Sequence, residues 1–373
     1  MNTKVSNFVQ IEKKSLEVAK SIFIPTKIEN PKIEAFSIHE LHQEAKKISS
    51  SVGVLKMQTA NECMNEARNM PTLKMLFDTL WFEVEICILF ADTNIGKSIL
   101  AVLIAQSIAS GIKINGFRIE TTAQKVLYFD AEMTSRQFRN RYKSDYPNGK
   151  DFEFSDNFFR LEIDPDNIDS ENESDFEKKI IESIRTAIDR TGAKILIIDN
   201  ITYLRSNNEK AGDALPLMKE LKRLKSEFDL SILVLAHTPK RDFTKPLTKN
   251  DIAGSKMLIN FCDSAFAIGE SAKSSNLRYI KQIKTRNAEF VFDAENVPIF
   301  EVKKTGTDSN FLSFDLLEHS TEREHLKELT EDEQDDISEK VLELKNEGKS
   351  DSEISRILKI NKMKVGRILK RNT

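Results

Sequence analysis

One short segment has the residue types and spacing needed to hold a polyphosphate. "ADTNIGKS", residues 91–98, fits the pattern G-x-x-x-x-G-K-[ST] except that Ala91 replaces the first glycine. In such a loop, backbone N–H groups and the N-terminus of the next helix surround the phosphates. Lys97 would reach the outer phosphates and Ser98 would ligate Mg²⁺. The predicted nucleotide-binding residues are Ala91, Asp92, Thr93, Asn94, Ile95, Gly96, Lys97, Ser98 and Ile99.

The alanine at the first position of this loop departs from the pattern. That position lies at the end of the preceding strand and makes few phosphate contacts, so a small side chain fits there if its φ is negative. Gly96 is kept where the backbone must approach the phosphates closely. We therefore expect the loop to bind a nucleoside triphosphate despite Ala91.

Three other apolar runs end in polar residues that could complete a site for phosphate chemistry. "KILIIDN" ends in Asp199, a carboxylate suited to associate with Mg²⁺. "KVLYFDAEM" carries Asp130 and Glu132, and a carboxylate there could orient and activate an attacking water. "LSILVLAHT" ends in His237, which could hydrogen-bond the outermost phosphate. The alternatives are a helix-capping or surface role for Glu132 and an isolated histidine for His237.

The elements that would position these residues form an alternating pattern from about residue 78 to 302. Continuous apolar runs such as "EICILFA" and "SILVLA" alternate with amphipathic runs such as "ESDFEKKIIESIRTAIDRT". This pattern predicts an α/β fold with a mostly parallel sheet covered by helices on both faces. The last strands follow one another without helices, which predicts an antiparallel far edge.

Composition narrows the class of protein. The 373 residues are 39% hydrophobic and 31% charged, with a formal net charge of −3, so any nucleic-acid binding depends on local clusters. Cys63, Cys87 and Cys262 are widely separated, which fits neither a disulfide framework nor a zinc site. The N-terminus has no secretory signal and the apolar runs are too short to span a bilayer. We expect a cytoplasmic protein without membrane contact.

The order of these motifs resembles that of the RecA-like ATPases, most closely the RepA-type hexameric replicative helicases and their plasmid and mobile-element relatives. The resemblance covers about residues 78 to 302 and implies ATP and Mg²⁺ as ligands. It departs from the family pattern at Ala91 and at Asn200, which follows the aspartate. The residues that it matches are Lys97 and Ser98 in the loop, Glu132 as catalytic glutamate, Asp199 as Mg²⁺-associated aspartate and His237 as sensor.

The same resemblance extends to a later basic strand. "DIAGSKMLINFCDSAFAI" is similar to the family segment G-S-x-x-L-x-N-x-x-D, and "YIKQIKTRN" to the strand that reaches the nucleotide of a neighbouring subunit. The resemblance implies that Lys284 and Arg286 act there in trans, in a homo-oligomeric ring. Alternate residues on a strand face the same way, so both cations could point across one interface. The alternative is a solvated basic strand face. The matches in the first segment are Gly254, Ser255, Asn260 and Asp263.

A basic loop follows the predicted sensor. In RecA-like rings, the loops in this position line the channel that grips single-stranded DNA, and a mobile basic loop suits a phosphate backbone. Only Phe243 is available for base stacking, and an ordinary solvated loop is the alternative. The cations of this loop are Lys240, Arg241, Lys245, Lys249 and Lys256.

The C-terminal segment reads as three short helices. Ile337, Val341 and Leu344 form the apolar stripe of the first, and Gly348 ends it. Ser350 and Glu353 form a capping box at the start of the second. The second stripe is Ile354, Ile357 and Leu358, and the third is Val365, Ile368 and Leu369.

This segment resembles a helix-turn-helix of resolvases and small regulators. The stretch 359–371 is basic and contains no acid, which suits a recognition helix in the major groove of duplex DNA. A protein-docking three-helix unit with a basic face is the alternative. The basic residues are Lys359, Lys362, Lys364, Arg367, Lys370 and Arg371.

These observations predict a modular DNA-acting ATPase. The expected parts are a polar, partly helical region (1–75), a RecA-like core (76–305), an acidic linker (306–335) and a helix-turn-helix (336–373). The expected activity is that of an ATP-dependent, helicase-like motor in plasmid or mobile-element replication or mobilisation. The alternative is a DNA-binding regulator or recombination accessory protein that ATP switches without unwinding.

Overall fold

The computed structural model describes residues 51–52, 55–164, 173–201, 214–239, 241–252, 256–328, 331–358, 360 and 362–371. The chain divides into two compact units, residues 1–71 and 72–373. In the described part of the first unit, β1 (Ser51–Val52) pairs with β2 (Leu55–Lys56) and α3 (Ala60–Arg68) follows. No residue of α3 is buried.

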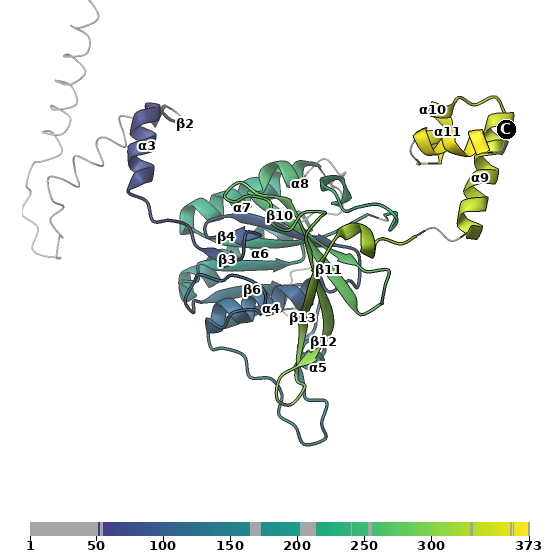
Figure 1. Cartoon of the computed structure of the whole chain (residues 1–373). Helices are drawn as coiled ribbons and strands as arrows, with labels where there is room; N and C mark the ends of the chain where they lie inside the picture. The colour runs from purple at the N-terminus through teal and green to yellow at the C-terminus, as the bar shows by residue number, and fades with distance from the viewer. Residues whose placement is uncertain are drawn as a thin grey trace, which may run out of the picture. The chain divides into compact units, whose positions relative to one another are not determined.

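A nine-stranded sheet organises the described part of the second unit, in the order β13-β12-β11-β10-β5-β9-β8-β6-β7 (Figure 1). The strands from β10 to β7 are mutually parallel, whereas β11, β12 and β13 are added antiparallel at one edge. The predicted mixed sheet is therefore confirmed. The strands are β5 (Ile86–Ala91), β6 (Val126–Asp130), β7 (Phe158–Glu162), β8 (Ile195–Asp199), β9 (Ser231–His237), β10 (Ser264–Glu270), β11 (Leu277–Lys284), β12 (Val297–Thr305) and β13 (Phe311–Ser320).

Helices cover both faces of this sheet, which explains why the central strands are apolar throughout. Every residue of β5 is buried, and its alternate side chains enter different cores. Ile88 packs in the core with α6 and α7, whereas Leu89 packs in the core with α4. The helices that cover the two faces are α4 (Lys97–Ser110), α5 (Ser135–Tyr142), α6 (Glu173–Thr191), α7 (Ala214–Phe228) and α8 (Lys256–Phe261). The hairpin of β3 (Met75–Phe77) and β4 (Trp81–Phe82) adds side chains to the α4 core.

The prediction that residues 306–335 form an acidic linker is wrong for most of the described part of that segment. The segment contains β13, which pairs with β12 from Phe311 to Ser320 as the edge strand of the sheet. Phe311 and Phe314 are buried in the α4 core, so the strand is held by packing as well as by hydrogen bonds. The core therefore extends past residue 305, through β13 and the short helix η4 (Glu322–His325).

The C-terminal segment forms the three predicted helices, α9 (Glu331–Asn346), α10 (Asp351–Ile357) and α11 (Lys362–Arg371). The predicted capping box of Ser350 and Glu353 begins α10. The prediction that Ile357 belongs to the apolar stripe of this helix is wrong, because its side chain is 53% exposed. The buried core of the unit is Val341, Ile354, Val365 and Ile368. None of the described helices is long and apolar enough to cross a membrane.

Candidate active site

The phosphate loop joins the end of β5 to the start of α4. Ala91 is fully buried and is absent from the described residues with positive φ, so the backbone accepts alanine there. Gly96 has φ 107°, a conformation that a side chain disfavours. A Cβ on Gly96 would also lie 3.0 Å from the ring of Phe314 on β13. The loop thus requires its second glycine and tolerates alanine in place of its first.

Lys97 is folded back onto this loop. Its ammonium donates to the carbonyl oxygens of Ala91 at 3.1 Å and Asp92 at 2.9 Å. It also lies 3.1 Å from Nδ1 of His237. Burial lowers the pKa of Lys97, and the carboxylates of Asp199 and Glu132 oppose that effect. The phosphate-loop lysine and the predicted sensor are therefore direct neighbours.

Asp199 lies at the end of β8, two strands away from the loop. Its side chain is buried and accepts hydrogen bonds from the hydroxyls of Tyr128, at 2.6 Å, and Ser98. Burial raises the pKa of this carboxyl to about 6. Ser98 and Asp199, predicted as the Mg²⁺-associated pair, are thus brought together.

These residues fit Mg²⁺ in its usual nucleotide-dependent arrangement. Mg²⁺ prefers oxygen ligands and commonly takes one or two from the protein and the rest from phosphates and water. A hydroxyl and a carboxylate in contact supply such a pair. Within the described residues, no three His, Cys, Asp or Glu side chains gather into a complete metal site. The remaining ligands would come from the nucleotide and solvent.

Glu132, Asn200 and His237 converge from the ends of β6, β8 and β9. The Asn200 amide donates to Oε1 of Glu132, and it lies 3.0 Å from Nε2 of His237. The same Glu132 oxygen is 3.6 Å from Nε2 of His237. The contact with His237 lowers the pKa of Glu132, so this carboxylate is ionised at neutral pH. Asn200 appeared in the sequence only as a departure from the family pattern.

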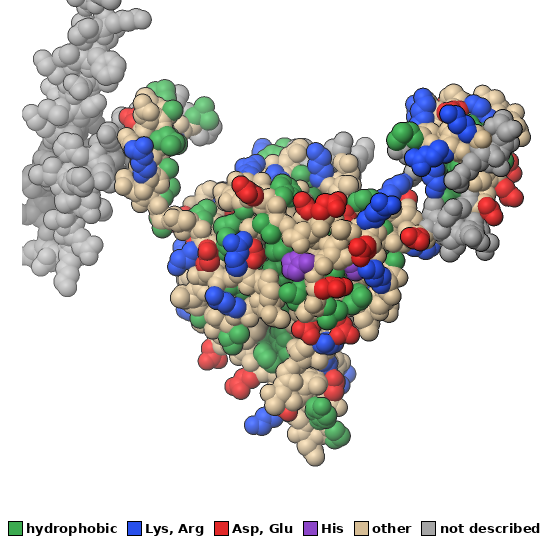
Figure 2. Space-filling view, in the orientation of Figure 1, with side chains coloured by type: hydrophobic (Ala, Val, Ile, Leu, Met, Phe, Trp, Pro, Cys, Tyr) green, Lys and Arg blue, Asp and Glu red, His purple; other side chains and the backbone are tan. Residues whose placement is uncertain are grey.

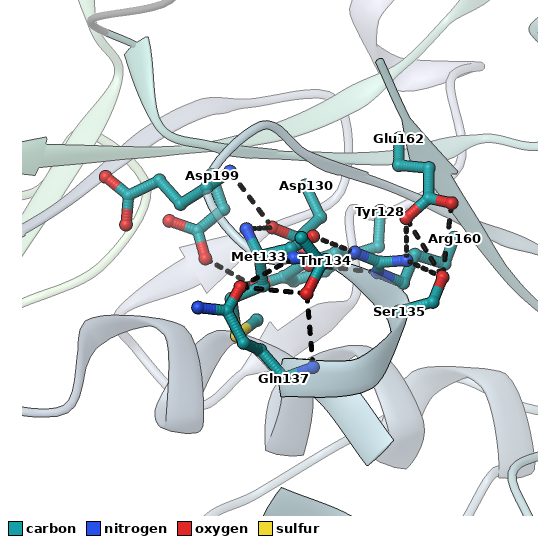
Figure 3. A network of polar contacts seen from close by, with 10 residues as sticks. Tyr128, Asp130, Met133, Thr134, Ser135, Gln137, Arg160, Glu162 and Asp199 are labelled. Atoms are coloured by element: carbon teal, nitrogen blue, oxygen red, sulfur yellow. Dashed lines mark hydrogen bonds and ion pairs between the residues drawn. The ribbon is translucent and has the colours of Figure 1, made fainter. Parts of the chain in front are cut away.

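The other carboxylate of this turn, Asp130, has a structural position. It is buried and accepts the backbone N–H groups of Glu132 at 3.2 Å and Met133 at 2.9 Å. Arg160 on β7 donates to its second oxygen at 2.9 Å (Figure 3). Asp130 therefore holds the turn, and Glu132 is the carboxylate that faces His237 and Lys97.

The predicted trans-acting pair lies away from the loop of its own chain. Lys284 donates to the carbonyl oxygens of Ile259 at 2.5 Å and Cys262 at 2.7 Å, at the end of α8. Arg286 is 3.4 Å from Asp263, and its side chain is 53% exposed. Asp263 accepts the N–H of Ile86, the first residue of β5, whereas the loop follows the last. Lys284 is thus engaged within the chain, and Arg286 lies exposed beside the opposite end of β5.

The basic loop after β9 is anchored in its described part, whereas a mobile loop was predicted. The N–H of Leu247 donates to Glu322 at 2.7 Å, and Lys281 donates to the carbonyl of Leu247 at 2.9 Å. Lys245 pairs with Asp242 at 3.0 Å. Arg241 donates to the Lys245 carbonyl, and Lys249 is exposed in η3 (Lys249–Asp251). Lys240, Gly254 and Ser255 lie outside the described residues, as does the side chain of Lys256.

The C-terminal unit presents cations on α11. Lys362, Arg367 and Lys370 are exposed, and Lys364 is half-buried. Arg371 ends the helix, and Lys359 lies outside the described residues. Figure 2 shows Lys and Arg side chains gathered on this unit.

Sequence reasoning missed four residues that hold this site: Tyr128, Arg160, Asn200 and Arg278. Arg278 on β11 is buried, and its Nε donates to the carbonyl of Ile95 in the phosphate loop at 2.9 Å. A buried arginine in an apolar strand was a signal for such a role, because a buried guanidinium needs partners. Arg160 carried the same signal in "NFFRLEID".

Comparisons with known proteins gave one family match and a set of similar solved structures. Residues 58–242 match a protein-family model described as an AAA domain. No curated protein matches the chain. Among solved structures, a KaiC-like protein from the hyperthermophilic archaeon Pyrococcus horikoshii OT3 is similar at 14% identity and a TM-score of 0.43, over 64% of this chain and 91% of that chain. The matched residues include the phosphate loop and the carboxylates at the ends of β6 and β8, so the match agrees with a P-loop ATPase domain in this part of the chain.

Proposed function

We propose that this chain hydrolyses ATP at the Lys97 site and uses the energy to act on DNA as a helicase-like motor. One observation carries the ATPase part of the proposal. Lys97, the Ser98–Asp199 pair, Glu132 and His237 lie at or just after the ends of four strands: His237 lies 3.1 Å from Lys97 and 3.6 Å from Glu132, and the charge of Asp199 acts on Lys97. This is the set of groups that phosphoryl transfer needs, arranged around a loop shaped for phosphates.

Each residue has a distinct task in this proposal. The N–H groups at the start of α4 and the Lys97 ammonium bind the β- and γ-phosphates. Ser98 and Asp199 hold Mg²⁺, which neutralises phosphate charge when bound. Glu132, ionised and oriented by Asn200, accepts a proton from the attacking water. His237 lies 3.1 Å from Lys97, where it can also bond the outer phosphate that Lys97 binds.

A second copy of the chain supplies the remaining cation in this proposal. Arg286 is exposed and lies at the end of β5 opposite the loop, so it cannot serve the site of its own chain without large movement. A neighbouring subunit in a ring would bring it to that site, where an arginine stabilises transition-state charge. Lys284, which caps α8, has an intrachain role instead.

The DNA part of the proposal rests on the basic surfaces. We propose that the three C-terminal helices are a helix-turn-helix, in which the exposed cations of α11 contact phosphates and base edges of duplex DNA. Lys245 and Lys249 in the loop after β9 suit a single strand. The setting proposed is replication or mobilisation of a plasmid or mobile element.

The test measures ATP hydrolysis with and without single-stranded DNA, in the wild type and in Lys97→Ala and Arg286→Ala. We expect stimulation by single strands that both variants lose. Mixing the two variants should restore part of the activity, because one site then receives Lys97 and Arg286 from different chains. A hydrolysis rate that does not change with DNA would contradict the proposed motor activity. No hydrolysis at all would contradict the proposed ATPase activity.

The second candidate is an ATP-switched DNA-binding regulator that does not unwind. The anchoring of Leu247 by Glu322 and Lys281, and the pairing of Lys245 with Asp242, favour it because they restrain the loop. Replacing Lys245 and Lys249 by glutamine separates the two functions. If the chain is a motor, this double variant loses the stimulation of hydrolysis by single-stranded DNA. If it is a regulator, hydrolysis does not respond to single strands in the wild type and stays the same in the variant.

A further inference from the structure

We infer that Arg160 is a positioning residue that fixes the turn carrying Glu132, and this rests on the proposed ATPase function. The turn lies between β6, which ends at Asp130, and α5, which begins at Ser135. Arg160 comes from β7, the edge strand beside β6. Its side chain is 15% exposed, whereas that of Asp130 is fully buried.

Arg160 binds this turn at both of its ends and in the middle. Its Nε donates to Asp130 at 2.9 Å, and its terminal nitrogens donate to the carbonyl of Met133 and to the hydroxyl of Ser135 at 3.2 Å. One terminal nitrogen also pairs with Glu162 at 2.5 Å. Figure 3 shows these groups converging on one guanidinium. A planar group with five donors can satisfy this set, and a lysine ammonium cannot span it.

The contacts act on Glu132 through Asp130. One Asp130 oxygen accepts the N–H groups of Glu132 and Met133, and the other accepts from Arg160. Removing the guanidinium frees the carboxylate to rotate, and both N–H groups then lose a fixed acceptor. The carbonyl of Met133 is released at the same time. The Arg160 guanidinium therefore holds the backbone of Glu132 indirectly, through Asp130 on one side and Met133 on the other.

Fixing this backbone matters because Glu132 is exposed and meets His237 only through its side chain. A general base must lie within hydrogen-bond reach of the proton that it accepts. A displacement of about 1 Å can lower a rate by about 100-fold. Arg160 is thus expected to control kcat without controlling nucleotide affinity, which depends on the loop between β5 and α4.

The experiment compares Arg160→Met and Arg160→Lys with the wild type, and with Arg139→Met as the matched control. Arg139 lies on α5 and pairs with Asp151, and its side chain is 67% exposed. Three quantities are measured: kcat for ATP, Kd for ADP with Mg²⁺, and hydrogen exchange of the amides in residues 131–134. The exchange arm needs no nucleotide.

For Arg160→Met we expect kcat to fall by about tenfold or more while Kd for ADP stays within about twofold. The amides of Glu132 and Met133 should exchange faster than in the wild type and in Arg139→Met. Arg160→Lys, which keeps the charge beside Asp130, should have a kcat and amide exchange rates between those of the wild type and Arg160→Met. If the methionine variant fails to fold, the lysine variant still tests the inference.

Wild-type kcat with wild-type exchange in both Arg160 variants would overturn the inference. An equal loss of kcat and ADP affinity would also overturn it, since the effect would then be a general one. If the wild type hydrolyses no ATP, the proposed function fails, and the exchange data alone decide whether Arg160 holds the turn.

Discussion

The ammonium of Lys97 lies 3.1 Å from Nδ1 of His237, so the phosphate-loop lysine and the predicted sensor are in contact. Two loop carbonyls, of Ala91 and Asp92, complete the surroundings of the ammonium. These three contacts equal the number of N–H donors of the ammonium, so a phosphate that bonded Lys97 would have to replace one of them. If it replaced His237, phosphate binding would be linked to the end of β9.

Replacing Lys97 by methionine should weaken ADP binding by about 10- to 100-fold, because a hydrogen bond to a charged group contributes about 1.5–3 kcal/mol. Titration with a fluorescent ADP analogue measures this. Lys113→Met, which changes an exposed lysine beyond α4, is the matched control. Equal affinities of the two variants would show that Lys97 does not bind the phosphates.

Glu132→Gln should lower kcat by about 10²- to 10⁴-fold and leave nucleotide affinity nearly unchanged. Glutamine can keep the contact with Asn200, but it cannot accept a proton at neutral pH. Steady-state hydrolysis and ADP titration measure the two quantities. The control is Glu153→Gln, at an exposed carboxylate. Unchanged hydrolysis would assign the base to another residue.

Asp199→Asn should be more stable than the wild type at pH 8, and this difference should vanish only below pH 3.8. Burial raises the pKa of Asp199 from its ordinary 3.8 to about 6. A raised carboxyl pKa favours the folded state below pH 3.8, and that advantage is lost as the pH rises through 6. The full difference corresponds to about 3 kcal/mol at most.

The measurement is denaturant unfolding of both proteins across this pH range, without nucleotide and with a chelator. Taking the difference between the two proteins cancels other titrating groups. A difference that does not change with pH would mean that the pKa of Asp199 is not raised in the folded protein.

Arg278→Met should weaken ADP binding by about tenfold, although Arg278 bonds the phosphate loop through the carbonyl of Ile95 and not through an N–H group. Its Nε bonds the carbonyl of Ile95, and in a trans peptide the N–H of the next residue, Gly96, points the opposite way. Arg278 therefore fixes the direction of a phosphate-binding N–H. ADP titration beside Arg136→Met, an exposed arginine on α5, checks this. Adenosine affinity should not change.

Ile354→Ala should destabilise the three-helix unit by about 2–5 kcal/mol, because Ile354 on α10 is fully buried in one core with Val341 of α9 and Val365 of α11. Ile357→Ala on the same helix should change stability by about 0.5 kcal/mol or less, since that side chain is 53% exposed. Hydrogen exchange of the helix amides measures both. Similar losses in the two variants would contradict the assigned core.

The sequence was sufficient to predict the strand ends that carry the site. Apolar runs such as "KILIIDN" are buried on both faces, so their length and their polar ends are both visible. Because parallel strands end at the same edge, Glu132, Asp199 and His237 had to meet. The loop and its helix followed from local spacing alone, and Ala91 was correctly expected to fit.

Other parts depend on contacts that spacing does not encode. β13 was missed because an edge strand is half exposed, and "NFLSFDLLEHS" mixes charged and apolar residues without clear alternation. Arg160 and Arg278 act on segments far away in sequence, and which segment each reaches depends on the order of strands. The sequence also could not show that the Lys284 ammonium would donate hydrogen bonds to carbonyl oxygens at the end of α8.

The buried ion pair of Lys281 and Glu322 joins β11 to η4. Both residues bind Leu247, in the loop that begins after His237, and Glu322 begins the helix that leads toward α9. The backbone N–H of Lys327 adds a bond to the carbonyl of Phe243. Separating η4 from β11 would leave the buried charge of Lys281 without Glu322, which is strongly unfavourable, and would also remove the acceptor of the Leu247 N–H. We therefore expect the loop and η4 to open together, with a shared opening free energy.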